Sequence, residues 1–136
     1  MPSFEVQVVT PLGPVLKAEC KSVNAPGALG QFEVLEGHIP FLTELHTGVL
    51  IVGMENQSQR YAITNGFLEV EPGGNVKVLV EKALLNSEVN VSQANQEVSQ
   101  LEEKLKAWDK DIDGEYQLLK DQEAWYQAQV DSAQVN

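Results

Sequence analysis

The order of apolar and polar positions divides the chain into two parts, and the first of them predicts β-structure. Up to about residue 86, short apolar and β-branched runs are separated by turn residues every 8 to 12 residues or so, which is typical of an all-β sandwich. The run at 4–8 alternates strictly, and the run at 76–80 places Val76, Val78 and Val80 on one face, so one face of each should be buried. Asn65-Gly66 matches a two-residue type I′ turn, and we expect it to form a hairpin between the runs at 59–64 and 67–71.

Near Ser87 the period changes and predicts two helices. The apolar residues that follow are spaced three and four apart, as in a helix that packs on another helix: Val91, Ala94, Val98, Leu101, Leu105 and Trp108. Asp113 is the expected N-cap of a second helix. The apolar positions of that helix are Tyr116, Leu119, Tyr126, Val130 and Ala133. We therefore predict an all-β sandwich, a flattened barrel of about ten short strands at 1–86, and an antiparallel two-helix hairpin at 87–136.

The segment between residues 30 and 48 combines tight-turn residues with exposed apolar candidates. Gly37 permits a positive φ, so a regular strand should not continue through it. Ile39, Phe41 and Leu42 follow in what should be a surface loop, where apolar side chains suggest a docking edge. His38 stands beside them, either as a residue that caps the turn or as part of the same contact.

The charge excludes several partners. Twenty acidic and nine basic residues give a formal net charge of −11, which opposes binding to nucleic acid and to anionic lipid. No apolar run approaches the roughly 20 residues that span a bilayer, and the first residues lack the features of a signal peptide, so we expect a cytosolic protein. Cys20 is the only cysteine, which leaves no internal disulfide, and it is expected to be a buried thiol without chemistry.

Catalytic chemistry is not predicted. His38 and His46 have no nucleophile in a recognisable setting, and no phosphate-binding glycine motif is present. Glu33, Glu36 and Glu44 surround the docking loop as solvated side chains. We expect no catalytic residue and no cofactor.

An acidic turn between the two helices leaves one alternative open. Asp109, Asp111, Asp113 and Gly114 match the first half of an EF-hand loop, but its twelfth position, normally a bidentate glutamate, is Lys120. A plain acidic turn with no metal is therefore expected. The alternative function is a free-standing acidic regulatory module that senses a divalent cation through 109–120.

Three sequence motifs resemble those of the epsilon subunit of F-type ATP synthases. They are Gly-Gln-Phe-x-Val-Leu-x-Gly-His-x-Pro-Phe-Leu-Thr from Gly30, Asn-Gly-Phe-Leu-Glu-Val from Asn65, and the last strand, Val-Lys-Val-Leu-Val, from Val76. The resemblance implies a non-catalytic subunit that binds the gamma subunit and the c ring of the rotor, and transiently alpha and beta, linking proton flow to ATP synthesis. It would be a monomer when isolated and peripheral in the complex, on the cytoplasmic side of the energy-transducing membrane.

The same resemblance assigns contact residues. The gamma contact falls on His38, Ile39, Phe41 and Leu42. The c-ring contact falls on Gln31, where the family has glutamate; Glu33 also replaces a usual glycine and Glu36 a usual proline.

The hairpin departs further from the family pattern. In relatives it can inhibit ATP hydrolysis through basic residues that face an acidic segment of the beta subunit. From Glu88 onward this chain has four basic and eleven acidic residues, a net charge of −7, which opposes such a contact. Some relatives bind ATP through an Ile/Leu-Asp-x-x-Arg-Ala motif. Its counterpart here is degenerate, because neutral Asn90 and Gln93 stand at the aspartate and arginine positions, between Val89 and Ala94. We therefore expect no nucleotide site.

Overall fold

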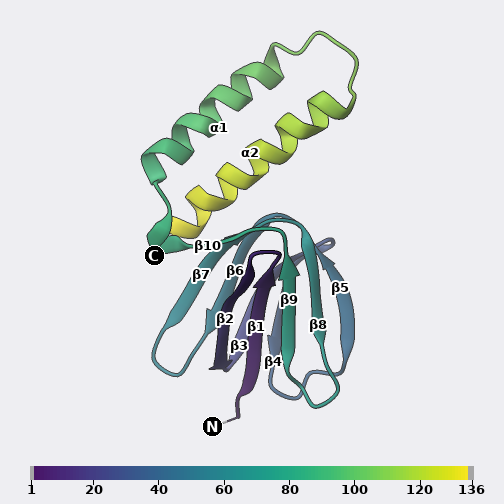
Figure 1. Cartoon of the computed structure of the whole chain (residues 1–136), viewed down its shortest axis with the longest axis vertical. Helices are drawn as coiled ribbons and strands as arrows, with labels where there is room; N and C mark the ends of the chain where they lie inside the picture. Colours follow the sequence, from purple (N-terminus) through teal and green to yellow (C-terminus); the bar gives the residue numbers. More distant parts are fainter. Residues whose placement is uncertain (1, 135–136) are drawn as a thin grey trace.

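The computed structural model describes residues 2–134, as a β-sandwich with a helical hairpin at one end (Figure 1). The strands are β1 (Phe4–Thr10), β2 (Gly13–Cys20), β3 (Ser22–Gly27), β4 (Gly30–Leu35), β5 (Phe41–Leu45), β6 (Gly48–Gly53), β7 (Ser58–Ile63), β8 (Gly66–Val70), β9 (Val76–Val80) and β10 (Ala83–Leu85). A short 3₁₀-helix, η1 (Asn86–Glu88), leads into α1 (Val91–Lys106) and α2 (Gly114–Ala133). The predicted architecture, a sandwich of ten short strands followed by two helices, is confirmed.

One curled sheet encloses the core. Its strand order is β10-β7-β6-β3-β5-β8-β9-β1-β2, and β4 pairs with β3. The β1–β9 pair is parallel, and the other pairs are antiparallel. The period-two geometry of strands places Val6 and Val8 of β1 inside, together with Val76 and Val78 of β9, each at most 1% exposed. The inward faces therefore form one continuous apolar core.

Asn65-Gly66 does not form the predicted hairpin. β7 pairs with β6 and β10, and β8 pairs with β5 and β9, so the strands on either side of this dipeptide are not neighbours. Neither residue has the positive φ that a type I′ turn requires. Instead, the Asn65 side chain accepts hydrogen bonds from the backbone N–H of Thr47 at 2.8 Å and from its hydroxyl at 3.0 Å. The dipeptide thus forms a turn between two strands that do not pair with each other. Its hydrogen bonds to Thr47 attach it to the β5–β6 turn.

The helical stripe is buried in its middle only. Ala94, Val98 and Leu101 of α1 are buried against α2, as the three-four spacing predicts, whereas Val91 is 41% exposed. Leu105 is half-buried near the other end of the stripe. The hairpin core is therefore short, and its two ends contribute little apolar burial.

α2 connects the hairpin to the sandwich. It packs on β6 and β7 on one side and on α1 on the other. Figure 1 shows the C-terminal end of α2 beside β7 and β10, while the connection between the helices lies away from the strands. β6 is consequently covered on both faces: Leu50 and Val52 lie in the core, and Val49 and Ile51 are half-buried.

Candidate docking surface

A tight turn joins β4 to β5 and carries the predicted contact loop. Gly37 has φ +84°, in the left-handed region that the sequence predicted for it. The backbone N–H of His38 donates to the Leu35 carbonyl at 3.2 Å and closes the turn. The chain is thereby redirected from β4 into β5, which crosses to a different neighbour, β8.

The four predicted gamma-contact residues divide into two kinds. The His38 ring lies 4.8 Å from the Phe41 ring, centroid to centroid, and Phe41 meets Phe32 edge to face at 6.0 Å. His38 Nδ1 also lies 2.8 Å from the Ile39 carbonyl oxygen. Ile39 and Leu42 point to solvent, with 73% and 66% of their surface exposed. The predicted surface loop is shorter than expected, because Phe41 and Leu42 already belong to strand β5 and pair with β8. His38 and Phe41 thus support the turn, and Ile39 and Leu42 present apolar surface beside it.

Gln31 lies at the other end of β4. It is exposed, and its side-chain amide donates to the Val49 carbonyl at 3.3 Å. Because β4 separates Gln31 from the loop at 36–40, the structure does not bring the predicted c-ring residue and the predicted gamma residues together.

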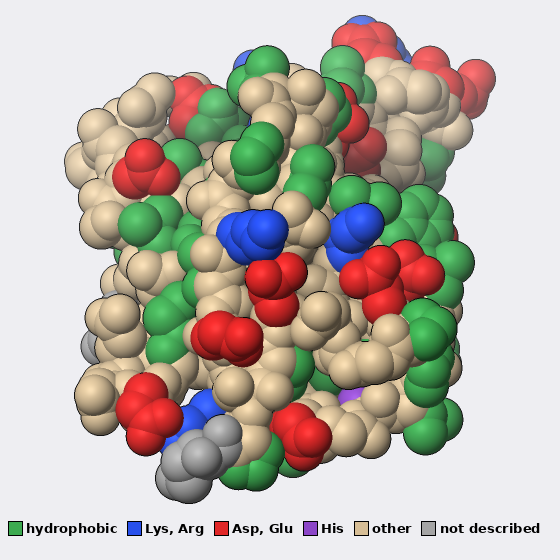
Figure 2. Space-filling view, turned by 60° about the horizontal axis from the view of Figure 1, so that its bottom comes forward, with side chains coloured by type: hydrophobic (Ala, Val, Ile, Leu, Met, Phe, Trp, Pro, Cys, Tyr) green, Lys and Arg blue, Asp and Glu red, His purple; other side chains and the backbone are tan. Residues whose placement is uncertain are grey.

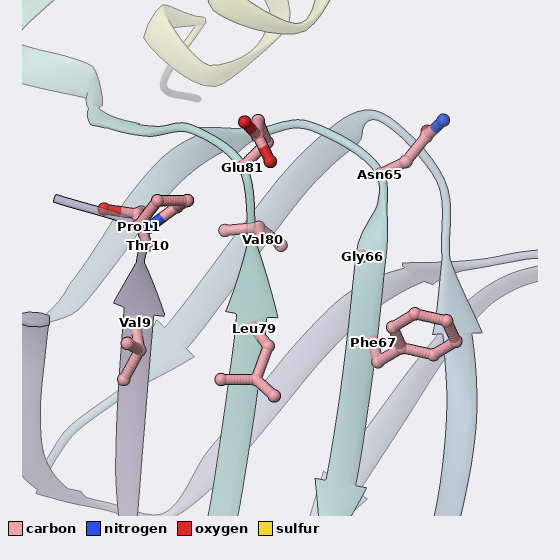
Figure 3. A pocket seen from close by; sticks show the side chains of 9 residues that line it. All are labelled: Val9, Thr10, Pro11, Asn65, Gly66, Phe67, Leu79, Val80 and Glu81. Carbon is pink, nitrogen blue, oxygen red and sulfur yellow. The ribbon is translucent and has the colours of Figure 1, made fainter. Parts of the chain in front are cut away.

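The outward faces of β5, β8, β9 and β1 carry an apolar band. Phe67 is paired with Leu79, and Leu79 with Val9, so three outward side chains form a row across β8, β9 and β1 (Figure 3). Leu42 faces Glu69 directly and is therefore the diagonal neighbour of Phe67, within reach of a large side chain. Phe67 and Leu79 are 48% and 46% exposed, and Val9 is half-buried. We call Leu42, Phe67, Leu79 and Val9 the outer-face band.

A shallow hollow of about 450 Å³ lies at one end of this band, lined by Val9, Phe67, Leu79 and their neighbours (Figure 3). Gly66 forms part of its wall, where any side chain would collide with the Leu79 carbonyl. Thr10, Asn65 and Glu81 also line the hollow, but most of its surface is apolar. An open, mainly apolar hollow suits the side chain of a partner protein better than a small polar substrate.

Sequence reasoning missed Phe67 and Leu79, although a signal for both was available. Leu68 and Val70 alternate as inward residues, as do Val78 and Val80, so the residues between them must face outward. A large apolar side chain at an outward position of a two-faced strand indicates a covered surface.

The charge around the band is mixed. In the space-filling view, acidic and basic side chains both lie between hydrophobic ones on the visible face (Figure 2). Glu44 lies opposite Phe67 across β5 and β8, and Glu81 borders the hollow. On its other side the band borders Glu69 and Lys77, which are paired across β8 and β9, so its margin carries both charges.

Cys20 is buried, as the sequence predicted, with 1% of its surface exposed. Burial, with a smaller effect from the nearby Glu19 carboxylate, raises the pKa of its thiol to about 11. The thiolate needed for nucleophilic chemistry is therefore nearly absent at neutral pH.

Two sequence motifs in the hairpin have structural roles. Asn90 belongs to the degenerate counterpart of the ATP-binding motif. It is the N-cap of α1, and its side chain accepts a hydrogen bond from the Gln93 backbone N–H at 3.0 Å. Asp113 caps α2 as predicted, accepting from the backbone N–H groups of Glu115 and Tyr116. Because α2 begins at Gly114, the second half of the EF-hand-like segment is helix. Across residues 2–134, no three His, Cys, Asp or Glu side chains gather as cation ligands.

The fold and this surface define a class: a ten-stranded β-sandwich with an exposed apolar band, joined to a helical hairpin. Residues 3–86 match the family model described as "ATP synthase, Delta/Epsilon chain, beta-sandwich domain". The chain is 42% identical over 103 residues to the ATP synthase epsilon chain of Geotalea uraniireducens, covering 76% of this chain and 74% of that one. It is 35% identical to the epsilon chain of Anoxybacillus flavithermus over 107 residues, 79% of each chain. The chain therefore belongs to the ATP synthase epsilon chain family.

Solved structures agree in fold. A chain of the Euglena gracilis mitochondrial ATP synthase, in a structure of OSCP, F1 and the c-ring, superposes with a TM-score of 0.82 at 17% identity. That match covers 94% of this chain and 79% of the other. A chain of the central stalk and c-ring of the Tetrahymena thermophila mitochondrial ATP synthase gives 0.67 at 18% identity, with 96% of each covered. Within residues 2–134, no helix has the length and hydropathy needed to cross a membrane.

Proposed function

We propose that this chain is a non-catalytic subunit of the central rotor stalk of an F-type ATP synthase. Its sandwich, residues 1–86, docks the gamma subunit to the c ring and so couples proton flow to ATP synthesis, and its hairpin, residues 87–136, regulates ATP hydrolysis. The complex holds it at the cytoplasmic side of the energy-transducing membrane. The observation that carries the docking role is the outer-face band, an apolar strip that extends from the predicted gamma-contact loop across four strands.

The band offers enough apolar surface for specific docking. Leu42, Phe67 and Leu79 are 66%, 48% and 46% exposed. Full burial of a side chain of this size contributes about 1.5–3 kcal/mol, so covering these exposed parts contributes about 2–5 kcal/mol together. That corresponds to roughly 30- to 4,000-fold in Kd. Ile39 extends the same contact at the loop.

The c-ring contact belongs at a separate place on the sandwich. Gln31 and the loop at 36–40 lie at opposite ends of β4, so one partner can bind the band and the loop while another meets the turn before β4. A subunit that links two rotor parts requires two separate surfaces of this kind. A neutral glutamine here makes the contact a hydrogen-bonded one, without the charge that the family's glutamate would bring.

The docking proposal is tested by the affinity of the purified full chain for purified gamma subunit. Phe67→Asp and Leu42→Asp should each weaken binding at least about tenfold, because a carboxylate would be buried in an apolar contact. Leu29→Asp is the matched control, since Leu29 is fully exposed in the β3–β4 turn and outside the band; its Kd should stay within about twofold of the wild type. Circular dichroism would check that each variant is folded.

The outcomes separate the parts of the proposal. Wild-type chain that fails to bind gamma at micromolar concentration would refute the rotor role. Binding that survives Phe67→Asp and Leu42→Asp as well as it survives Leu29→Asp would refute the band as the docking surface. ATPase activity of the assembled head with the full chain, compared with a chain cut after Asn86, tests the hairpin: equal activities would refute regulation by residues 87–136.

A further inference from the structure

Arg60 joins the sandwich to the end of the hairpin. It is the only arginine in the chain, and it lies on β7, half-buried. Its Nε donates to the Ser132 carbonyl at 3.1 Å, and its Nη2 donates to the Asp131 carbonyl at 3.2 Å. One planar guanidinium thus spans two consecutive carbonyls in the last turn of α2.

The position of Arg60 matches the electrostatics of the helix end. The last carbonyls of a helix have no amide four residues on to pair with, and they form the negative end of the helix dipole. The Asp131 carbonyl accepts from the Gln134 backbone N–H at 3.2 Å, so Arg60 is its second donor. α2 has no basic residue in its last turn, so the cation comes from β7. The carboxylate of Asp131 accepts from the Gln127 side-chain amide at 3.0 Å, and it is the carbonyl of this residue that meets Arg60.

The other polar contacts between hairpin and sandwich are modest. Apolar contact is made where α2 packs on β6, with Val49 and Ile51 half-buried, and buried Ser132 donates its hydroxyl within the helix, to the Gln129 carbonyl. Lys82 lies over the Trp125 ring, 5.6 Å from its centroid. An exposed cation–π contact of this kind contributes little. The two charge-assisted hydrogen bonds of Arg60 are therefore the strongest polar attachment described between the two parts.

We propose that Arg60 is the latch that holds the hairpin in its folded position on the sandwich. Withdrawal of the guanidinium from the Asp131 and Ser132 carbonyls would then release α2 from β6 and β7, with α1 still packed on it. The inference rests on the proposed regulatory role for its consequence, because release is what would bring the hairpin to another subunit. Its test uses the isolated full chain and does not depend on that role.

Two tryptophans distinguish release of the hairpin from its unfolding. Trp125 faces Lys82 of the sandwich, whereas Trp108 lies at the far end of the hairpin, 5.6 Å from the Tyr116 ring. In a Trp108→Phe background, Arg60→Gln should raise acrylamide quenching of Trp125. In a Trp125→Phe background, the same substitution should leave Trp108 quenching unchanged.

Hydrogen exchange gives the magnitude. Loss of hydrogen bonds to a charged group should speed exchange of amides in the last two turns of α2 by roughly 10- to 100-fold, without change in β1 or β9. Arg60→Lys keeps the charge but loses the fork, and should fall between Arg60→Gln and wild type. Lys17→Gln, an exposed cation on β2, is the control for loss of one positive charge and should match wild type.

The results decide between the latch and its alternatives. Unchanged Trp125 quenching and unchanged α2 exchange in Arg60→Gln would overturn the proposal. A parallel rise in Trp108 quenching with loss of helical circular dichroism would also overturn it, because the hairpin would then be unfolding. If Arg60→Gln releases the hairpin while ATPase activity of the assembled head stays the same, the latch stands and the proposed regulatory function fails.

Discussion

Gly66→Ala tests the corner that replaces the predicted hairpin. Gly66 has no positive φ, so its lack of a side chain serves packing and not backbone conformation. An added Cβ would overlap the Leu79 carbonyl oxygen and lie 2.8 Å from Val80 Cγ1. The carbonyl belongs to β9, which is bonded on both sides to β8 and β1, so the backbone has little freedom to move away.

The magnitude separates the two interpretations of this dipeptide. If Gly66 only supplied a left-handed conformation, alanine would lower the free energy of unfolding by about 1–2 kcal/mol. A backbone collision inside a paired sheet should lower it by about 3 kcal/mol or more, at the upper end of overpacking effects. For a chain of this size that is a decrease in Tm of about 10 °C.

Urea and thermal denaturation, followed by far-ultraviolet circular dichroism, would measure the effect. Gly114→Ala is the matched control: a Cβ there has open space, and alanine at the start of α2 should be neutral or stabilising by up to about 1 kcal/mol. A Gly66→Ala protein within about 1 kcal/mol of wild type would refute the steric role assigned to this glycine.

Three further substitutions test single interactions. Asn65→Ala removes the acceptor for both donors of Thr47 and should lower the free energy of unfolding by about 1–2 kcal/mol in urea denaturation, with Asn56→Ala, at an exposed turn, as the control. Asp113→Ala removes the N-cap of α2 and should cost about 1 kcal/mol, seen as faster exchange at the start of that helix and not at its end. Cys20, whose folded pKa is raised to about 11, contributes stability that is complete below pH 9 and lost as the pH rises toward 11. Relative to Cys20→Ala, the wild type should therefore lose about 1.4 kcal/mol by pH 10; an unchanged difference between pH 8 and 10 would contradict this.

Strand alternation and helical spacing predicted most of the elements because each reports a local geometry. They missed β5, whose first residues were expected to lie in a surface loop, and the short β10. Val76 and Val78 are buried as their period requires, and Ala94 and Val98 lie between the helices for the same reason. Turn residues behave differently. The Asn65-Gly66 pair is compatible with several backbone conformations. Which one it adopts depends on the pairing of β8 with β5. That pairing joins distant parts of the chain, and no local sequence motif specifies it.

The candidate site was partly predictable for a related reason. The sequence motif at 30–43 predicted that His38, Ile39 and Leu42 lie at a docking edge. Only the register of β5, β8 and β9 shows that Leu42 adjoins Phe67 and Leu79 on the same face. Pair contacts across a sheet depend on strand order, which the sequence pattern leaves open. The contact of Arg60 with the end of α2 is harder still to predict from the sequence, because Arg60 is 71 and 72 positions from its two partners in the chain.

Residues 89–94, the degenerate counterpart of the family's ATP-binding motif, lead to a last prediction about the hairpin. Asn90 and Gln93 replace the charged members of the family's word, and both are engaged at the start of α1, where the Asn90 side chain accepts from the Gln93 backbone N–H. Ala94, the last residue of the motif, is buried. The motif has no arginine and adjoins a hairpin of net charge −7, so a nucleoside triphosphate lacks the cation that the family's motif supplies.

Millimolar ATP should accordingly leave the amide chemical shifts of the full chain unchanged. The double substitution Asn90→Asp and Gln93→Arg restores the family's charges while aspartate keeps a capping oxygen, so α1 should remain intact. Only that variant should gain a measurable ATP response. A saturable shift near Gln93 in the wild type would show that the neutral word still binds nucleotide and would refute the electrostatic argument.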